Sequence, residues 1–141
     1  MRFELIDAVL DRTDDRIVAV KLVSAAEEYL QDHFPDFPVL PGVFMLEAMV
    51  QAARLLESPD GGSRLAIGGV RALKYGRFVR PGETLRVEVD RTGGDGENLM
   101  FRGVAKVIGA GLSLDEAHTA ATGQFTLRPL LARVCPPSSV R

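Results

Sequence analysis

The sequence contains almost none of the residues that hold small proteins together by covalent bonds or metal ions. Its 141 residues include one cysteine, two histidines and no tryptophan. The single cysteine, Cys135, has no partner for an intrachain disulfide and cannot assemble a thiolate metal site. Because disulfides belong to oxidising compartments, we expect a cytoplasmic protein that folds without a metal ion.

Long hydrophobic runs and an excess of one charge are also missing. The formal net charge is -2, so the surface as a whole attracts neither nucleic acid nor anionic lipid. The longest apolar stretch, residues 39–53, contains proline, glycine and a glutamate, and it is too short to cross a bilayer. Charged residues interrupt the first apolar segment too early for a signal peptide. We therefore expect neither a nucleic-acid partner nor a membrane partner.

What the chain does have is enough apolar material for one core. Hydrophobic residues make up 46% of the sequence, and the length suits a single domain. We predict one domain over residues 1–130. It is followed by a flexible tail over residues 131–141, which includes the sequence Cys-Pro-Pro-Ser-Ser.

One segment predicts a long helix and six predict strands. The helix covers residues 41–56, where Pro41 suits a first-turn position and good helix formers follow. It is apolar on nearly every face, so we expect burial along most of its length. A short helical turn is predicted over residues 25–31. The segments with strand composition are residues 3–10, 16–24, 65–76, 84–91, 98–108 and 118–128. An antiparallel sheet curled around the helix buries both elements, which is the α+β hot-dog fold.

Three polar residues, one in the loop before this helix and two within it, suggest proton chemistry. His33 lies in a loop fixed by prolines, and histidine is the side chain best suited to moving protons near neutral pH. Glu47 lies mid-helix among apolar neighbours, where desolvation favours the protonated acid. Gln51 follows at i+4 and is placed to orient that carboxyl. Together these residues offer a base and an acid.

The same helix start offers hydrogen-bond donors. The amides of Gly42 and Val43 are unpaired at the positive end of the helix dipole, where they can hold a carbonyl oxygen. Taken singly, each residue has a plain structural explanation. A loop histidine is often structural, a helix glutamate can pair at a subunit boundary, and Gly42 can serve as a flexible joint. The combination favours removal of water beside a thioester carbonyl.

The motifs that carry these residues resemble the bacterial 3-hydroxyacyl-acyl carrier protein dehydratases. The resemblance rests on His33-Phe34-Pro35, Pro41-Gly42-Val43 and Glu47-Ala48-Met49-Val50-Gln51, and on the spacing from His33 to Glu47. Residues 3–11 and 74–83 are also similar to family segments. Asp32 and Asp36 stand where the family commonly has glycine, and residues 109–117 look like an insertion, so substrate choice is open.

The resemblance implies an activity and a set of roles. The substrate would be a (3R)-3-hydroxyacyl chain on the phosphopantetheine arm of an acyl carrier protein, and the product a trans-2-enoyl thioester, in fatty acid or polyketide biosynthesis. His33 would take the C2 proton, Glu47 would protonate the leaving hydroxyl, and Gly42 with Val43 would bind the carbonyl. Gln51 would support the carboxylate. No cofactor or metal is required. Glutamate at position 47 resembles the branch that dehydrates without isomerising.

The resemblance also implies partners. In the family the histidine of one subunit meets the carboxylate of another, so we expect a homodimer or a larger homo-oligomer. Large apolar residues near the helix start are candidates for an acyl tunnel or simply for the core: Phe34, Phe37, Phe44, Met45 and Met49. Four basic residues with no acid among them are candidates for docking an acidic carrier or form a solvated strand face: Arg71, Lys74, Arg77 and Arg80.

Two other functions fit parts of the pattern. A hot-dog acyl thioesterase uses the same architecture with a carboxylate near a helix start, although it does not need this histidine spacing. A non-catalytic acyl-binding or assembly subunit would fit the fold, but it has no need to retain both His33 and Glu47.

Overall fold

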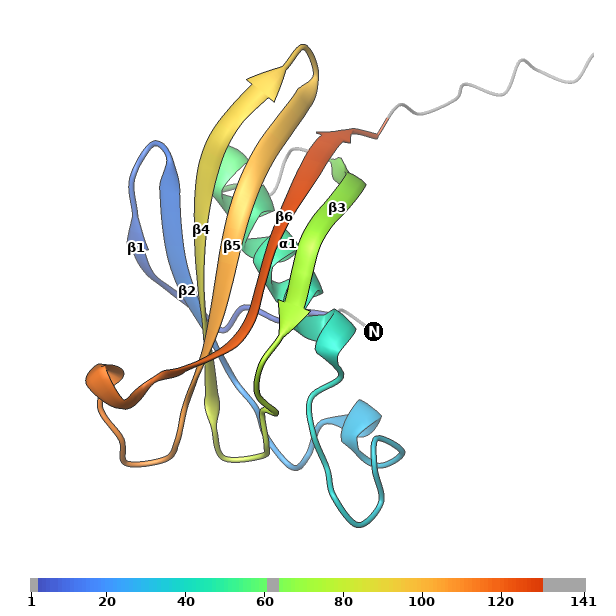
Figure 1. Ribbon diagram of the computed structural model, residues 1–141, viewed down its shortest axis with the longest axis vertical. Coiled ribbons are helices and arrows are strands. Elements are labelled where there is room, and N and C mark those ends of the chain that lie inside the picture. The colour runs from blue at the N-terminus through green and yellow to red at the C-terminus, as the bar shows by residue number, and fades with distance from the viewer. Residues whose placement is uncertain (1–2, 61–63, 131–141) are drawn as a thin grey trace, which may run out of the picture.

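The protein is a six-stranded antiparallel sheet curled around one long helix, as the computed structural model shows for residues 3–60 and 64–130 (Figure 1). The strands are β1 (Ala8–Arg12), β2 (Arg16–Leu22), β3 (Leu65–Tyr75), β4 (Thr84–Asp95), β5 (Asn98–Ile108) and β6 (His118–Pro129), in the sheet order β1-β2-β4-β5-β6-β3. Two 3-10 turns, η1 (Glu28–Leu30) and η2 (Leu114–Glu116), lie in the connections. This arrangement is the predicted α+β hot-dog fold. The predicted tail, with Cys135, lies outside the described residues.

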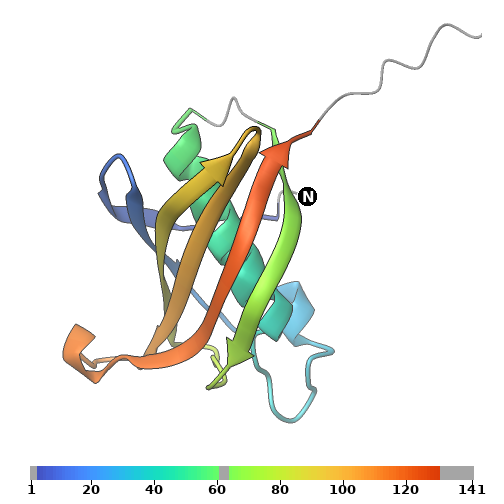
Figure 2. The ribbon, with the colours of Figure 1, turned by 45° about the horizontal axis from the view of Figure 1, so that its top comes forward.

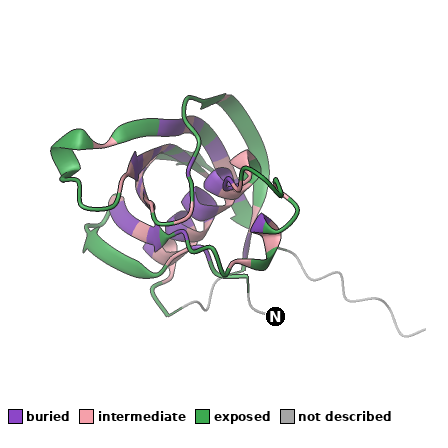
Figure 3. Ribbon diagram, turned by 90° about the horizontal axis from the view of Figure 1, so that it is seen from below, coloured by how far each residue is buried: buried purple, intermediate pink, exposed green. Residues whose placement is uncertain are grey.

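Helix α1 (Gly42–Glu57) lies against the concave face of the sheet (Figures 1 and 2). Eight of its residues are buried: Met45, Leu46, Ala48, Met49, Val50, Ala52, Ala53 and Leu56. Opposite them, Leu85, Val87 and Val89 alternate with more exposed residues along β4, as the period of the sequence predicts. A side chain at Gly103 on β5 would collide with Met49. The helix and the sheet therefore form one core, which Figure 3 shows as the buried centre of the molecule.

One face of the helix is not covered, which corrects the expectation of burial on nearly every face. Val43 is 60% exposed, and Glu47, Gln51 and Arg54 are each only partly buried. These four residues, which we call the open stripe, follow one another at helical spacing on a single side. The helix is wrapped by the sheet on its other sides only.

Two strand boundaries differ from the prediction by more than two residues. The first strand begins at Ala8 instead of residue 3, because the preceding segment bonds to the helix instead of a strand. The side chain of Gln51 accepts a hydrogen bond from the Leu5 amide at 2.7 Å and donates one to the Phe3 carbonyl at 3.0 Å. The predicted strand over residues 84–91 also ends too early, because the glycine-rich segment after residue 91 is not a loop. β4 continues through it with an irregular register near Gly93, and Asp95 pairs with Asn98 across the turn.

The two edges of the sheet differ in character. β1 is a short edge of five residues with a register shift after Val9. β3 is an edge of eleven residues, and it exposes Ile67 and Val70 at 37% and 38%. Within residues 3–60 and 64–130, neither α1 nor the two 3-10 turns has the length and apolarity that a bilayer crossing requires.

Candidate active site

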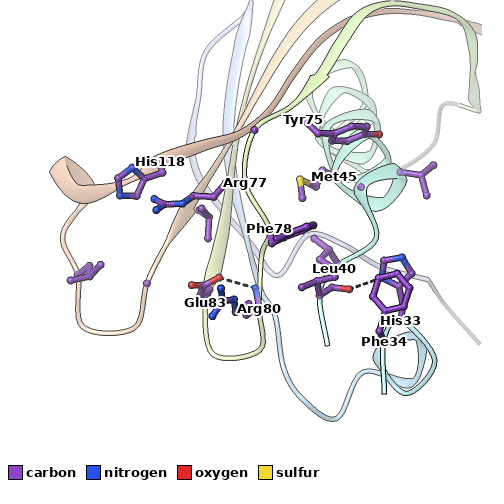
Figure 4. A pocket seen from close by; sticks show the side chains of 17 residues that line it. His33, Phe34, Leu40, Met45, Tyr75, Arg77, Phe78, Arg80, Glu83 and His118 are labelled. Carbon is purple, nitrogen blue, oxygen red and sulfur yellow. Dashed lines mark hydrogen bonds between the residues drawn. The ribbon is translucent and has the colours of Figure 1, made fainter. Parts of the chain in front are cut away.

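A pocket of about 1030 Å³ opens at the start of α1 (Figure 4). Its walls come from the proline loop, the first turn of α1, the segment after β3, and the ends of β5 and β6. The residues that line it are His33, Phe34, Val39, Leu40, Gly42, Val43, Met45, Tyr75, Gly76, Arg77, Phe78, Arg80, Glu83, Val107, Gly109, Leu112 and His118. The predicted base and the predicted carbonyl-binding amides therefore share one cavity.

The proline loop holds His33 in a defined orientation and tautomer. The His33 Nδ1 lies 2.9 Å from the Val39 carbonyl oxygen, and the Val39 amide donates back to the His33 carbonyl at 3.0 Å. A carbonyl can only accept, so Nδ1 carries the proton and the neutral ring has its lone pair on Nε2. Phe34 stacks on the imidazole at 4.5 Å between ring centroids. Nε2 is therefore the nitrogen through which the predicted base would accept a proton.

The helix start brings backbone donors to the same pocket. α1 begins at Gly42, and its geometry leaves the amides of Gly42 and Val43 without intrahelical partners. A Cβ atom at Gly42 would lie 2.9 Å from Cε1 of Tyr75, so any larger residue here would have to displace that ring. Burial raises the pKa of the Tyr75 hydroxyl above its usual range, and the phenol stays neutral at physiological pH.

The Glu47 carboxylate lies on the open stripe, one helical turn beyond Val43. Its Oε1 accepts a hydrogen bond from Gln51 Nε2 at 3.1 Å and forms a salt bridge with Arg54 Nη1 at 3.4 Å. The predicted contact between Gln51 and the carboxylate is therefore present. The expected apolar surroundings are not, because Glu47 is 30% exposed in its side chain. Its sequence neighbours Leu46 and Ala48 point to other sides of the helix, toward the core.

Among residues 3–60 and 64–130, no hydrogen bond or ion pair joins His33 to Glu47. Glu47 is absent from the pocket lining, whereas Val43, one turn earlier on the open stripe, belongs to it. One turn of helix separates positions by about 6 Å along the axis. The carboxylate of a single chain therefore lies beyond the rim of the pocket that contains its own His33.

The five acyl-tunnel candidates fall into two groups. Phe34 and Met45 line the pocket. Phe37 lies outside its lining and packs edge-on against Phe78 at 5.8 Å. Phe44 packs against Tyr29 at 4.8 Å, and Met49 is fully buried against the sheet, so both belong to the core of this chain.

The four basic candidates for docking lie in two places. All are exposed, and none forms an ion pair with an acid among residues 3–60 and 64–130. Arg77 and Arg80 line the pocket, and the Arg80 guanidinium lies 4.9 Å above the ring of Phe37. Arg71 and Lys74 lie on the edge strand β3 and do not line the pocket.

Sequence reasoning missed three residues at the site. His118 lines the pocket beside Arg77 (Figure 4), and Tyr75 forms the wall opposite Gly42. Both come from strands far along the chain, so no local pattern could have found them. Arg54 could have been found, because it lies at i+7 from Glu47 and i+3 from Gln51 on the same helix face. In the described part of the chain, no group of three His, Cys, Asp or Glu residues is arranged to hold a metal ion.

A sheet wrapped around a helix, with a histidine pocket at the start of that helix, defines a hot-dog enzyme. A family model described as ApeI-like, ApeI dehydratase, matches residues 10–111. The chain therefore belongs to the ApeI-like dehydratase family.

Named relatives agree with this family. The chain is 41% identical over 132 residues to the 3-hydroxyacyl-acyl-carrier-protein dehydratase FabZ of Thermus thermophilus, covering 89% of this chain and 87% of that protein. It is 36% identical over 105 residues to FabZ of Thermotoga neapolitana, with 74% and 77% coverage. The match to FabZ of Lactococcus lactis, at 44% identity over 86 residues, spans 59% of this chain and only 60% of that protein. The predicted dehydratase class is confirmed.

Solved structures confirm the fold. The dehydratase heterocomplex ApeI:P from Xenorhabdus doucetiae superposes with a TM-score of 0.67 at 19% identity, over 92% of this chain and 84% of that chain. An acyl-CoA hydrolase from Agrobacterium tumefaciens superposes with a TM-score of 0.64 at 17% identity, over 85% of this chain and 44% of that chain. Because the same fold occurs in a hydrolase, the fold alone does not distinguish dehydration from hydrolysis.

Proposed function

We propose that this dehydratase removes water from (3R)-3-hydroxyacyl thioesters carried on acyl carrier protein, giving trans-2-enoyl thioesters for fatty acid or polyketide biosynthesis. The observation that carries the proposal is the orientation of His33. Its Nδ1 is committed to the Val39 carbonyl, and the ring shares a pocket with Gly42 and Val43, whose amides have no partners within α1. A base next to carbonyl-binding donors is what proton removal alpha to a thioester requires.

The proposed reaction divides between three groups. The amides of Gly42 and Val43 hold the thioester oxygen, which stabilises the enolate-like charge that develops there. His33 Nε2 takes the proton from C2. Glu47 gives a proton, directly or through a water molecule, to the C3 hydroxyl as it leaves. Gln51 keeps the carboxyl in place. The chain's own residues account for both proton transfers without a cofactor.

We propose that the site is completed by a second copy of the chain. Glu47 lies on the open stripe, outside the pocket of its own His33, and Arg54 links this stripe to the first residue of β3 through the Leu65 carbonyl at 2.8 Å. β3 is the longer free edge and exposes Ile67 and Val70. Pairing of two β3 edges would cover this apolar surface and bring the open stripe of one subunit toward its partner. A homodimer is the smallest assembly that this proposal allows.

Carrier docking is proposed for the basic rim of the pocket. Arg77, Arg80 and His118 line the pocket, where the phosphate of a phosphopantetheine arm and an acidic carrier would be attracted. Arg71 and Lys74, on the edge strand, would contribute at longer range. If the patch docks the carrier, Arg77→Glu raises the KM for carrier-bound substrate and weakens its dependence on salt. An unchanged KM would exclude this patch.

The activity is tested with carrier-bound 3-hydroxyacyl chains of graded length. We expect enoyl absorbance to appear without release of free thiol. Release of thiol at the same rate would instead indicate a thioesterase, and tight acyl binding without turnover would indicate a binding subunit. The same assays, repeated with coenzyme A thioesters, determine the chain length and the carrier that the enzyme prefers. The cytoplasmic location is a prediction that localisation experiments test.

The Xenorhabdus structure is a heterocomplex, which suggests one alternative to a homodimer. A different hot-dog chain could supply the carboxylate that meets His33. A chain that is monomeric and inactive alone, but active with a second hot-dog chain, would favour this alternative.

A further inference from the structure

We propose that Arg54 is a positioning residue for turnover, which fixes the Glu47 carboxyl so that only Oε2 meets the substrate. This inference rests on the proposed dehydratase function, and it adds a residue that neither the sequence motif nor the pocket lining contains. Arg54 does not line the pocket, so it acts through Glu47.

Both donors to the carboxyl reach the same oxygen. Gln51 Nε2 lies 3.1 Å from Oε1 and Arg54 Nη1 lies 3.4 Å from it. Among residues 3–60 and 64–130, no side chain or amide donates to Oε2. A proton on this carboxyl would therefore be carried by Oε2, because Oε1 already accepts two hydrogen bonds in either protonation state.

Each donor is itself held by backbone, so the carboxyl has a rigid support. Gln51 accepts from the Leu5 amide at 2.7 Å and donates to the Phe3 carbonyl at 3.0 Å. Arg54 donates through Nε to the Leu65 carbonyl at 2.8 Å. The N-terminal segment and the start of β3 thus approach Glu47 from two sides. Removing Arg54 frees the carboxyl to rotate about its last bond, and the reacting oxygen is no longer fixed.

The chain provides a matched control at the other end of the same helix. Arg91 pairs with Glu57, the last residue of α1, at 2.6 Å. Ten residues of helix separate Glu57 from Glu47, which is about 15 Å along the axis. Arg91→Met therefore removes an arginine from a helix glutamate without reaching the site.

The experiment is a double-mutant cycle on the full-length chain. The four proteins are wild type, Arg54→Met, Glu47→Gln and the double variant, compared in steady-state kcat and KM on a carrier-bound 3-hydroxyacyl thioester and in urea unfolding. We expect Arg54→Met to lower kcat about tenfold with KM within about twofold. In the Glu47→Gln background the same change should have no further effect. Arg54→Lys should recover part of the rate, and Arg91→Met should keep the wild-type rate.

The outcomes separate this inference from the proposed function. Equal losses of rate in both backgrounds, or a rise in KM alone, would overturn the positioning role. Should Arg54→Met not fold, Arg54→Lys and Arg54→Gln give the same comparison with smaller changes in volume. A wild-type chain that dehydrates no thioester would overturn the proposed function. The unfolding free energies of the four proteins would then still show whether Arg54 and Glu47 interact, and so whether Arg54 holds the carboxyl.

Discussion

At the residue scale, the chemistry of this protein depends on how two side chains are held. His33 is fixed by a hydrogen bond to the Val39 carbonyl, and Glu47 by contacts from Gln51 and Arg54. The sequence predicted the pairing of Gln51 with Glu47, because helix geometry brings i and i+4 together. It could not predict the partial exposure of Glu47, since that depends on which helix face the sheet leaves uncovered.

Removal of either group should abolish most of the activity. We expect His33→Ala and Glu47→Gln to lower kcat by at least about 100-fold, the usual contribution of a general acid or base. The measurement is hydration of a crotonyl thioester, which runs the reaction in reverse. Glu57→Gln, on the same helix but far from the pocket, serves as the control. Near wild-type turnover in either site variant would reject its catalytic role.

The outer face of the sheet should make stability depend on pH. Burial alone would raise the pKa of Glu88, but hydrogen bonds from Arg86 and Lys106 outweigh it and the pKa is lowered from 4.5. A lowered folded pKa means that the stabilisation is complete above the unfolded value and is lost as the pH falls below about 4.5. Urea unfolding is measured at about four pH values between about pH 3 and about pH 7. Wild type should lose more stability in acid than Glu88→Gln does. Parallel pH curves for the two proteins would contradict this explanation.

At the element scale, the start of α1 and the end of β3 build the pocket together. The sequence predicted the helix start from Pro41 and Gly42, and β3 from its composition. It could not predict that Tyr75 approaches Gly42, since the contact joins residues 33 positions apart and depends on how the sheet curls. For the same reason the contribution of β6 through His118 was not foreseen, and the strand expected over residues 3–10 was partly replaced by contacts with Gln51.

A methyl group at position 42 tests this contact. The Cβ of Gly42→Ala would lie 2.9 Å from the Tyr75 ring. Because the ring is 52% exposed, it can swing aside at little cost in stability, but its movement changes the shape of the pocket that it lines. We expect about a tenfold loss of kcat with a nearly unchanged melting temperature, and partial recovery in Gly42→Ala/Tyr75→Ala. Loss of stability without loss of rate would show that the contact is only structural.

At the scale of the whole molecule, we propose that one chain is an incomplete enzyme. The pocket contains His33 but not Glu47, while β3 is a long free edge that exposes Ile67 and Val70. Composition predicted enough apolar residues for one core, and the helix and the sheet share a single buried cluster. Composition gave no information on where a second copy binds, because an interface is defined by surfaces that only the folded sheet creates.

The two edges of the sheet give matched variants for this assembly. Val70→Glu places a charge on β3, and it should convert a dimer to monomers and remove activity. Val9→Glu places the same charge on the other edge, β1, and it should change neither. Light scattering combined with size-exclusion chromatography gives the mass. A dimer that survives Val70→Glu but not Val9→Glu would move the interface to β1.

The most direct test of a shared site mixes two inactive variants. His33→Ala retains Glu47, and Glu47→Gln retains His33, so a mixed dimer contains one intact site and one site that lacks both groups. Unfolding and refolding equal amounts together should give about a quarter of the wild-type activity, because half of the dimers are mixed and each has one working site of two. Activity no greater than that of the separate variants would show that His33 and Glu47 do not meet across subunits.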